Sequence, residues 1–110
     1  MTVNDIVSHL DLEVLNMACS DREIEGGYTG DLLSWVMSKA KYGDSWITIM
    51  TNVNIVAVAS LVDTACVIVA ENAELADDVI EKAKQQGVNL FRSEKSSFTL
   101  CLEIAKMLKI

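Results

Sequence analysis

Residues 45–70, "SWITIMTNVNIVAVASLVDTACVIVA", decide the fold. "SWITIM" alternates as a strand does, and "ACVIVA" is a continuous apolar run, typical of a strand buried on both faces. The stretch between them, "NVNIVAVASLVD", is rich in Val and Ile, which locally favour a strand. If the flanking strands are parallel, their connection must be a crossover of about a dozen residues, usually a helix. We therefore predict a helix between two strands, capped by Asn52 or Asn54.

The same layout continues on both sides of this stretch. Helical spacing of apolar residues predicts helices over 2–10, 31–43, 73–87 and 96–109, and apolar runs predict strands over 12–19 and 88–92. Residues 20–30 follow neither period and are predicted to form a long loop. The order predicts one α/β domain over residues 1–110, a layered sandwich with a largely parallel four-stranded sheet and helices on its faces.

Charge and hydropathy exclude several classes of partner. The net charge is −7, from 16 acidic and 9 basic residues, and the basic residues are scattered. Nucleic acids and anionic membranes need clustered Lys and Arg, so neither is expected. No apolar run approaches the roughly 20 residues of a membrane span, and the N-terminus lacks the layout of a signal peptide. We expect a cytoplasmic protein.

Residue types that carry catalysis are sparse. Cys19, Cys66 and Cys101 lie far apart among apolar neighbours, as buried reduced thiols do, and His9 is the only histidine. A metal site or a nucleophile with its base would have to be built around that one histidine. We therefore predict no enzyme activity, no metal and no cofactor.

The glycine-rich stretch 26–34, "GGYTGDLLS", precedes a predicted helix and could in principle cradle a phosphate. Its glycines do not match a phosphate-binding motif, no Lys lies in it, and Asp31 would repel an anion. We favour a turn in which the glycines adopt positive φ and Thr29 or Asp31 caps the helix. The phosphate cradle stays as the alternative.

Polar residues follow the predicted strands at the edge where ligands of parallel α/β sheets gather. "RSEKSS" (92–97) is the better anion candidate, since it sets cations before a helix start; the alternative is a capped helix with solvated charges. The candidate ligand-binding residues are Arg22, Gly26, Gly27, Thr29, Gly30, Asn52, Asn54, Asn72, Arg92, Lys95 and Ser96.

The last predicted helix is apolar over most of its circumference. Its polar positions form one narrow stripe, so the helix should be covered on more than one side. A second copy in a twofold homodimer is the cover we favour, and the first helix of the same chain is the alternative.

Residues 12–108 resemble the DRTGG domain family. The resemblance rests on "DREIEGGYTGDLLSWVM", "WITIMTNVNIVAVASLVDTACVIVA" and "AKQQGVNLFRSEKSSF", in that order. Such domains accompany CBS-domain pyrophosphatases and some phosphotransacetylases, and a similar unit forms the N-terminal domain of HPr kinase/phosphorylase. Where the family has Asp-Arg and Thr-Gly-Gly, this chain reads Thr51-Asn52-Val53 and Ala70-Glu71-Asn72, as in a stand-alone variant.

The resemblance implies a non-catalytic regulatory or protein-interaction module, commonly dimeric, whose partner is a second copy or another protein. The alternative is a sensor that binds a nucleotide or another phosphorylated metabolite at the carboxyl ends of the strands.

Overall fold

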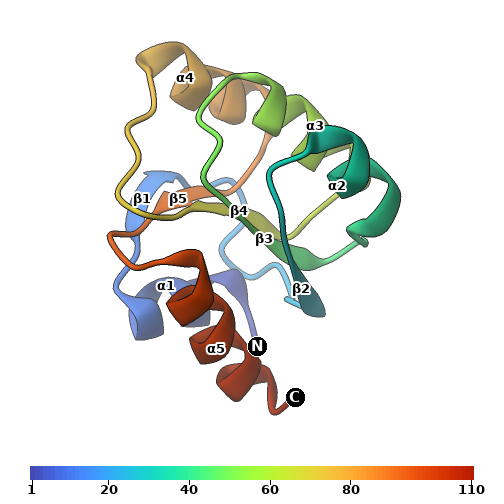
Figure 1. Ribbon diagram of the computed structural model, residues 1–110. Coiled ribbons are helices and arrows are strands. Elements are labelled where there is room, and N and C mark those ends of the chain that lie inside the picture. Colours follow the sequence, from blue (N-terminus) through green and yellow to red (C-terminus); the bar gives the residue numbers. More distant parts are fainter.

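A computed structural model describes all 110 residues of the chain (Figure 1). Helices and strands alternate along nearly the whole chain, except that β2 follows β1 directly. The elements are α1 (Val3–Leu10), β1 (Glu13–Asn16), β2 (Gly26–Thr29), α2 (Leu33–Lys39), β3 (Asp44–Thr48), α3 (Asn54–Val62), β4 (Cys66–Val69), α4 (Asp77–Gln86), β5 (Leu90–Arg92) and α5 (Ser97–Leu108).

The five strands form one sheet in the order β1-β5-β4-β3-β2. The pairs β2–β3, β3–β4 and β4–β5 are parallel, and β1 joins the edge antiparallel to β5. The predicted fold class, a largely parallel α/β sandwich, is thus confirmed. The predicted number of four strands is wrong, because residues 26–29 lie in the sheet as the edge strand β2.

The strand β2 escaped prediction because its residues have little strand propensity. Two glycines occupy half of it, and Tyr28 is its only large apolar side chain. Neither Gly26 nor Gly27 has positive φ, so the expected glycine turn is wrong. Their small size matters instead, since a Cβ on Gly26 would lie 2.9 Å from the Asp44 carboxylate, inside contact distance. Close approach to β3, and not local turn chemistry, explains these glycines.

The stretch 54–62 is helical, as the crossover argument predicted. The predicted cap is wrong, because the N-cap of α3 is Val53, which makes no side-chain cap bond; the Asn52 side-chain oxygen accepts a hydrogen bond from the Asn54 N–H at 2.9 Å just before the helix. At the other predicted cap the structure differs: α2 begins only at Leu33, and no side chain caps it. Asp31 accepts hydrogen bonds from the Thr48 hydroxyl at 2.7 Å and the Ile49 N–H at 2.9 Å. The carboxylate therefore ties the chain after β2 to the end of β3.

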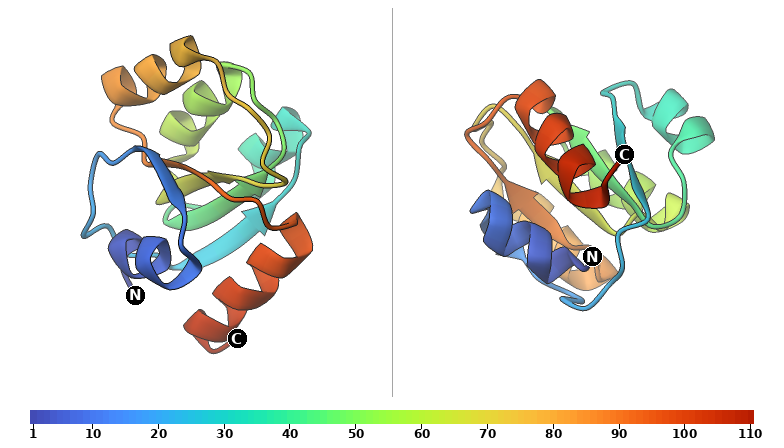
Figure 2. Two further views of the ribbon diagram at one scale, coloured as in Figure 1. Left: turned by 90° about the vertical axis from the view of Figure 1, so that its left-hand side faces the viewer. Right: turned by 90° about the horizontal axis from the view of Figure 1, so that it is seen from below.

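Helices cover both faces of the sheet (Figures 1 and 2). The helices α1 and α5 lie on one face, and α2, α3 and α4 lie on the other. Alternate strand residues feed the two cores: Ile47 and Ile68 pack on the α1–α5 side, while Trp46 and Val67 pack on the opposite side. Each fully buried side chain of this size contributes about 1.5–3 kcal/mol to folding.

The edge strand β1 is held by a buried amide. Asn89, only 4% exposed, accepts hydrogen bonds from the Ala18 and Cys19 N–H groups and donates to the carbonyls of Cys19 and Ala65. Asn16 adds a bond from its side-chain nitrogen to the Val88 carbonyl at 2.8 Å. These bonds fix the chain that leaves β1 against the body of the sheet.

None of the five helices combines the length and the apolar character that a membrane crossing requires.

Candidate functional site

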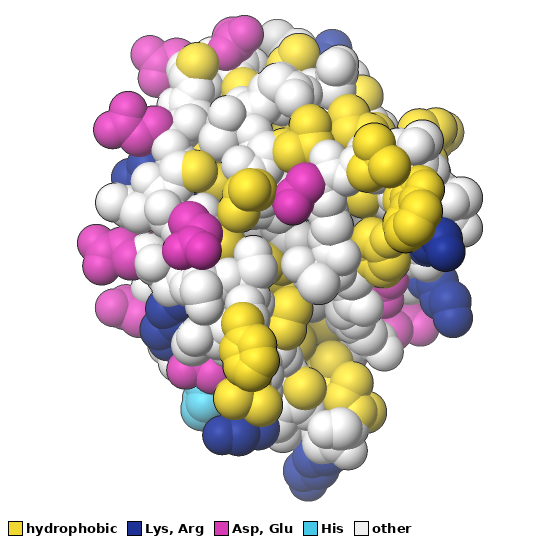
Figure 3. All heavy atoms as spheres, in the orientation of Figure 1, with side chains coloured by type: hydrophobic (Ala, Val, Ile, Leu, Met, Phe, Trp, Pro, Cys, Tyr) yellow, Lys and Arg dark blue, Asp and Glu magenta, His cyan; other side chains and the backbone are white.

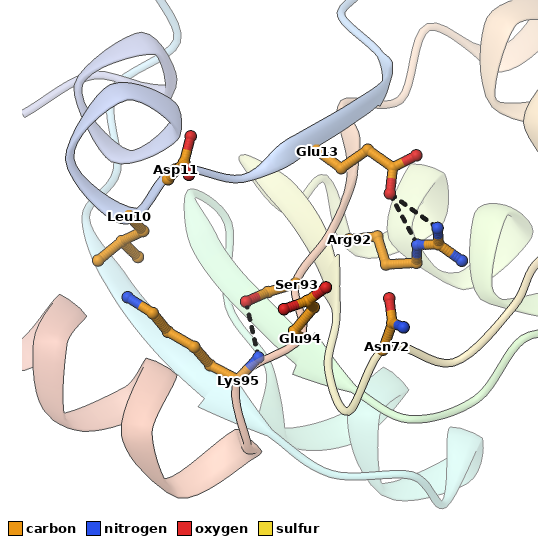
Figure 4. A pocket seen from close by; sticks show the side chains of 8 residues that line it. All are labelled: Leu10, Asp11, Glu13, Asn72, Arg92, Ser93, Glu94 and Lys95. Carbon is orange, nitrogen blue, oxygen red and sulfur yellow. Dashed lines mark hydrogen bonds and ion pairs between the residues drawn. The ribbon is translucent and has the colours of Figure 1, made fainter.

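A polar groove lies where β4 and β5 end (Figure 4). It has a volume of about 450 Å³ and brings together three of the predicted ligand residues, Asn72, Arg92 and Lys95. Because β1 runs antiparallel to β5, the start of β1 also reaches this groove. The other lining residues are Leu10, Asp11, Glu13, Ser93 and Glu94.

The charges of the groove are largely paired within the chain. Arg92 Nη2 lies 2.8 Å from Glu13 Oε1, and Arg92 Nε donates to the same oxygen at 2.9 Å. Lys95 points its ammonium away from Arg92 (Figure 4), and its Nζ atom lies 2.9 Å from Oε2 of Glu103 in α5. Asp11 and Glu94 add two more carboxylates to the lining. The groove is therefore lined by two basic residues, both already paired, and by three acidic side chains, which is a poor setting for a free phosphate.

The backbone after β4 has an unusual conformation. Glu71 and Asn72 both have positive φ, 61° and 53°, which costs a non-glycine residue of order 1 kcal/mol or more. Their N–H groups donate to the carbonyls of Lys95 and Ser93, so the turn after β4 is fastened to the turn after β5. Among the residues drawn in Figure 4, no hydrogen bond reaches the Asn72 side chain. Its amide is thus presented to the groove.

Ser96, Asn52 and Asn54 lie at the same end of the sheet but do not line this groove. Ser96 is the N-cap of α5, where its hydroxyl oxygen accepts from the Thr99 N–H at 3.2 Å, which agrees with the capped-helix alternative for "RSEKSS". Asn52 and Asn54 follow β3, and the Asn52 side-chain oxygen accepts a hydrogen bond from the Asn54 N–H at the start of α3.

Arg22 does not lie at the carboxyl ends of the strands, and its predicted place there is wrong. Its guanidinium donates to the Asp63 side chain and carbonyl at 3.0 and 2.7 Å, and it lies 4.8 Å from the centre of the Tyr42 ring. Asp63 and Tyr42 precede β4 and β3, which places Arg22 at the amino ends. Gly26 and Gly27, at the start of β2, lie toward the same end.

Thr29 and Gly30 do lie at the carboxyl end of β2, though apart from the polar groove. The Gly30 carbonyl accepts from the Trp46 indole N–H at 3.0 Å, and the Gly30 N–H donates to Ile47. The Gly30 N–H is therefore already bonded and is not free to bind a phosphate. Thr29 instead borders an apolar surface.

Sequence reasoning missed Asp11, Glu13, Ser93 and Glu94 as groove residues. Glu13 and Arg92 are 79 positions apart and meet only because β1 pairs with β5 in antiparallel register. Ser93 and Glu94 lie inside the quoted "RSEKSS", so that stretch held the signal for both.

An apolar surface runs between the last helix and the edge strand β2. Phe98 is 74% exposed and Leu102 is 47% exposed, while Leu100 and Ile104 of the same helix face the core. Figure 3 shows hydrophobic side chains gathered over α5 and, separately, over α2 on the face that carries β2. We call the first of these surfaces the α5–β2 seam, made of Thr29, Phe98, Cys101, Leu102 and Ala105.

The environments of all three cysteines reduce the reactivity of their thiols. Complete burial raises the pKa of Cys66 to about 12, and partial burial raises the pKa of Cys101. The pKa of Cys19 is raised chiefly by its hydrogen bond to Asp21. Each shift lowers the fraction of reactive thiolate at neutral pH. No three His, Cys, Asp or Glu side chains lie close enough together to hold a metal ion.

No protein-family model and no curated protein matches the sequence. A solved structure does match the fold: the CBS and DRTGG domains of the regulatory region of Clostridium perfringens pyrophosphatase, complexed with its activator, diadenosine tetraphosphate. The TM-score is 0.73 at 18% identity, over 90% of this chain and 44% of that one. The chain thus spans less than half of that regulatory region. The likeness shows that the fold is one found in a regulatory region with CBS and DRTGG domains.

Proposed function

We propose that this chain is a non-catalytic regulatory module of DRTGG type that acts by binding protein, and that its first partner is a second copy. The observation that carries the proposal is the exposure of Phe98 and Leu102 beside the edge strand β2. A contiguous apolar surface on a small domain marks an interaction site. The helix α1 contacts α5 but leaves this flank uncovered, so the chain itself does not supply the second cover.

The edge strand beside this flank supports the same proposal. No residue of β2 is charged and none is proline, so β2 lacks two of the features that usually keep edge strands apart. The likeness to a regulatory region, together with thiols that stay protonated, is consistent with a role without catalysis.

Light scattering on size-exclusion fractions tests the proposal. We expect the wild type to show twice the 12.1 kDa monomer mass. Phe98→Glu should reduce the mass to that of a monomer, because a carboxylate in an apolar interface loses its hydration. Leu61→Glu is the matched control: Leu61 is 70% exposed on α3, on the opposite face of the sheet. A monomeric wild type, or a Phe98→Glu variant that stays dimeric, would contradict the proposal.

A second candidate function is that of a small-molecule sensor at the polar groove. It is favoured by the Asn72 amide, which the positive-φ turn presents toward Arg92. The structural neighbour was solved with diadenosine tetraphosphate, a nucleotide. The three carboxylates of the groove oppose a bare anion, so a phosphorylated ligand should bind here as its Mg²⁺ complex.

Thermal unfolding with ATP or diadenosine tetraphosphate, each with Mg²⁺, tests the sensor. At a ligand concentration of about 100 Kd, binding to the folded state adds about 2.7 kcal/mol and raises Tm by roughly 10 °C. Asn72→Ala should abolish the rise, whereas Asn54→Ala, at the same end of the sheet but outside the groove, should keep it. An unchanged Tm with both nucleotides argues against this function.

A further inference from the structure

A protruding side chain and an apolar hollow both lie along the α5–β2 seam. Phe98 protrudes from the first turn of α5. Two turns further along the helix, a hollow of about 170 Å³ is lined by Ala105 and Leu108 of α5 and by Gly27 of β2. Phe98 and Ala105 are seven positions apart, so both lie on one side of the helix, roughly 10 Å apart along its axis.

The hollow has the size and character to hold an aromatic ring. Seven of its nine lining residues are hydrophobic and none is charged. For comparison, a cavity of about 150 Å³ lined by apolar side chains binds benzene. The hollow is also shaped by two small residues, Gly27 and Ala105, whose lack of side-chain bulk leaves the space open.

We infer that, in the dimer of the proposed function on which this rests, Phe98 of each copy fills this hollow of the other. A twofold axis that sets the two α5 helices antiparallel satisfies both contacts at once, as a self-complementary interface must. With Phe98 opposite Ala105 of the partner helix, the same register sets Leu102 opposite the smaller Cys101. Large side chains then meet small ones along the whole contact.

Charge favours a second copy in the same register. Lys109, just past the end of α5, is exposed, and Glu94, just before α5, is exposed too. The register that sets Phe98 opposite Ala105 also brings Lys109 of one copy toward Glu94 of the other, twice per dimer. The opposed helix dipoles add to this preference.

Complementary variants test the inference by sedimentation equilibrium. Phe98→Ala removes the protruding ring but keeps the hollow, and Ala105→Phe fills the hollow but keeps the ring. Each variant alone should dimerise at least about tenfold more weakly than the wild type. A 1:1 mixture can form one ring-in-hollow contact per heterodimer. The mixture should therefore contain more dimer than either variant alone at the same total concentration. Circular dichroism of each variant checks that it is folded.

A cross-link makes the test independent of Ala105→Phe. In a Cys19→Ser background, which removes the exposed thiol, Leu102→Cys should form a covalent dimer through Cys101 under mild oxidation. Ser60→Cys, at an exposed position on α3, is the matched control and should form no covalent dimer under the same treatment.

The outcomes separate this inference from the proposed function. A wild-type dimer that Phe98→Glu disrupts, with no heterodimer in the mixture and no cross-link, would overturn the ring-in-hollow contact alone. A monomeric wild type would overturn both.

Discussion

The two edges of the sheet are built differently. At one edge, β1 carries Glu13 paired with Arg92, and its register shifts between Val14 and Asn16. Asn89 pins the chain that follows. At the other edge, β2 has four uncharged residues, two of them glycine, and an exposed apolar helix flank beside it. Charge and a bulge are two of the means by which proteins protect an edge, so the contrast supports the proposal that the β2 side is the binding surface.

The largest effect on stability is expected at the β1 edge, which we call the protected edge. Asn89→Ala removes four hydrogen bonds of a buried amide and leaves backbone groups of Ala18, Cys19 and Ala65 without their partner. We expect the free energy of unfolding to fall by about 3–5 kcal/mol in urea titrations. Asn54→Ala, at an exposed position, should stay within about 0.5 kcal/mol of wild type. A loss below about 1 kcal/mol for Asn89→Ala would mean that β1 is not held in this way.

A smaller effect on stability is expected at the β2 edge, which we call the open edge. Asp31→Ala removes the carboxylate that accepts from Thr48 and Ile49, which is the link between the end of β2 and β3. We expect a loss of about 1–2 kcal/mol in the same titration. Glu74→Ala, an exposed acidic residue in a loop after β4, controls for the loss of negative charge and should have little effect. If the two variants are equally stable, Asp31 does not fasten the open edge.

The smallest effect concerns the ion pair of the protected edge. Glu13 is half exposed and Arg92 is only partly buried, so solvent screens their attraction. Glu13→Gln should cost less than about 1 kcal/mol, and 1 M NaCl should reduce even that difference. A loss of several kcal/mol would show that the ion pair, and not Asn89, holds β1 in place.

The central β3–α3–β4 unit could be predicted from the sequence because buried parallel strands need a crossover helix between them. That requirement made 54–62 a helix against the strand preference of its Val and Ile residues. The sequence did not predict β2, because Gly26 and Gly27 have low strand propensity and join the sheet only by pairing with β3.

Part of the candidate site was predictable from the sequence. Asn72 follows β4, Arg92 ends the neighbouring parallel strand β5 and Lys95 follows it, so their meeting in one groove follows from the topology. Glu13 reaches Arg92 through an antiparallel pairing that no local pattern encodes, and this partner changes the charge of the groove. The apolar excess of the last helix was visible in its residues, but which residues face outward depended on how α5 packs: Leu100 is buried and Phe98 is not.

The molecular mass in solution tests the central claim most directly. Light scattering should give twice 12.1 kDa for the wild type and for Val14→Glu, which adds a charge at the protected β1 edge. Phe98→Glu, at the open edge, should give the monomer mass. A wild-type mass of 12.1 kDa, or a Val14→Glu variant that dissociates while Phe98→Glu stays dimeric, would contradict the account.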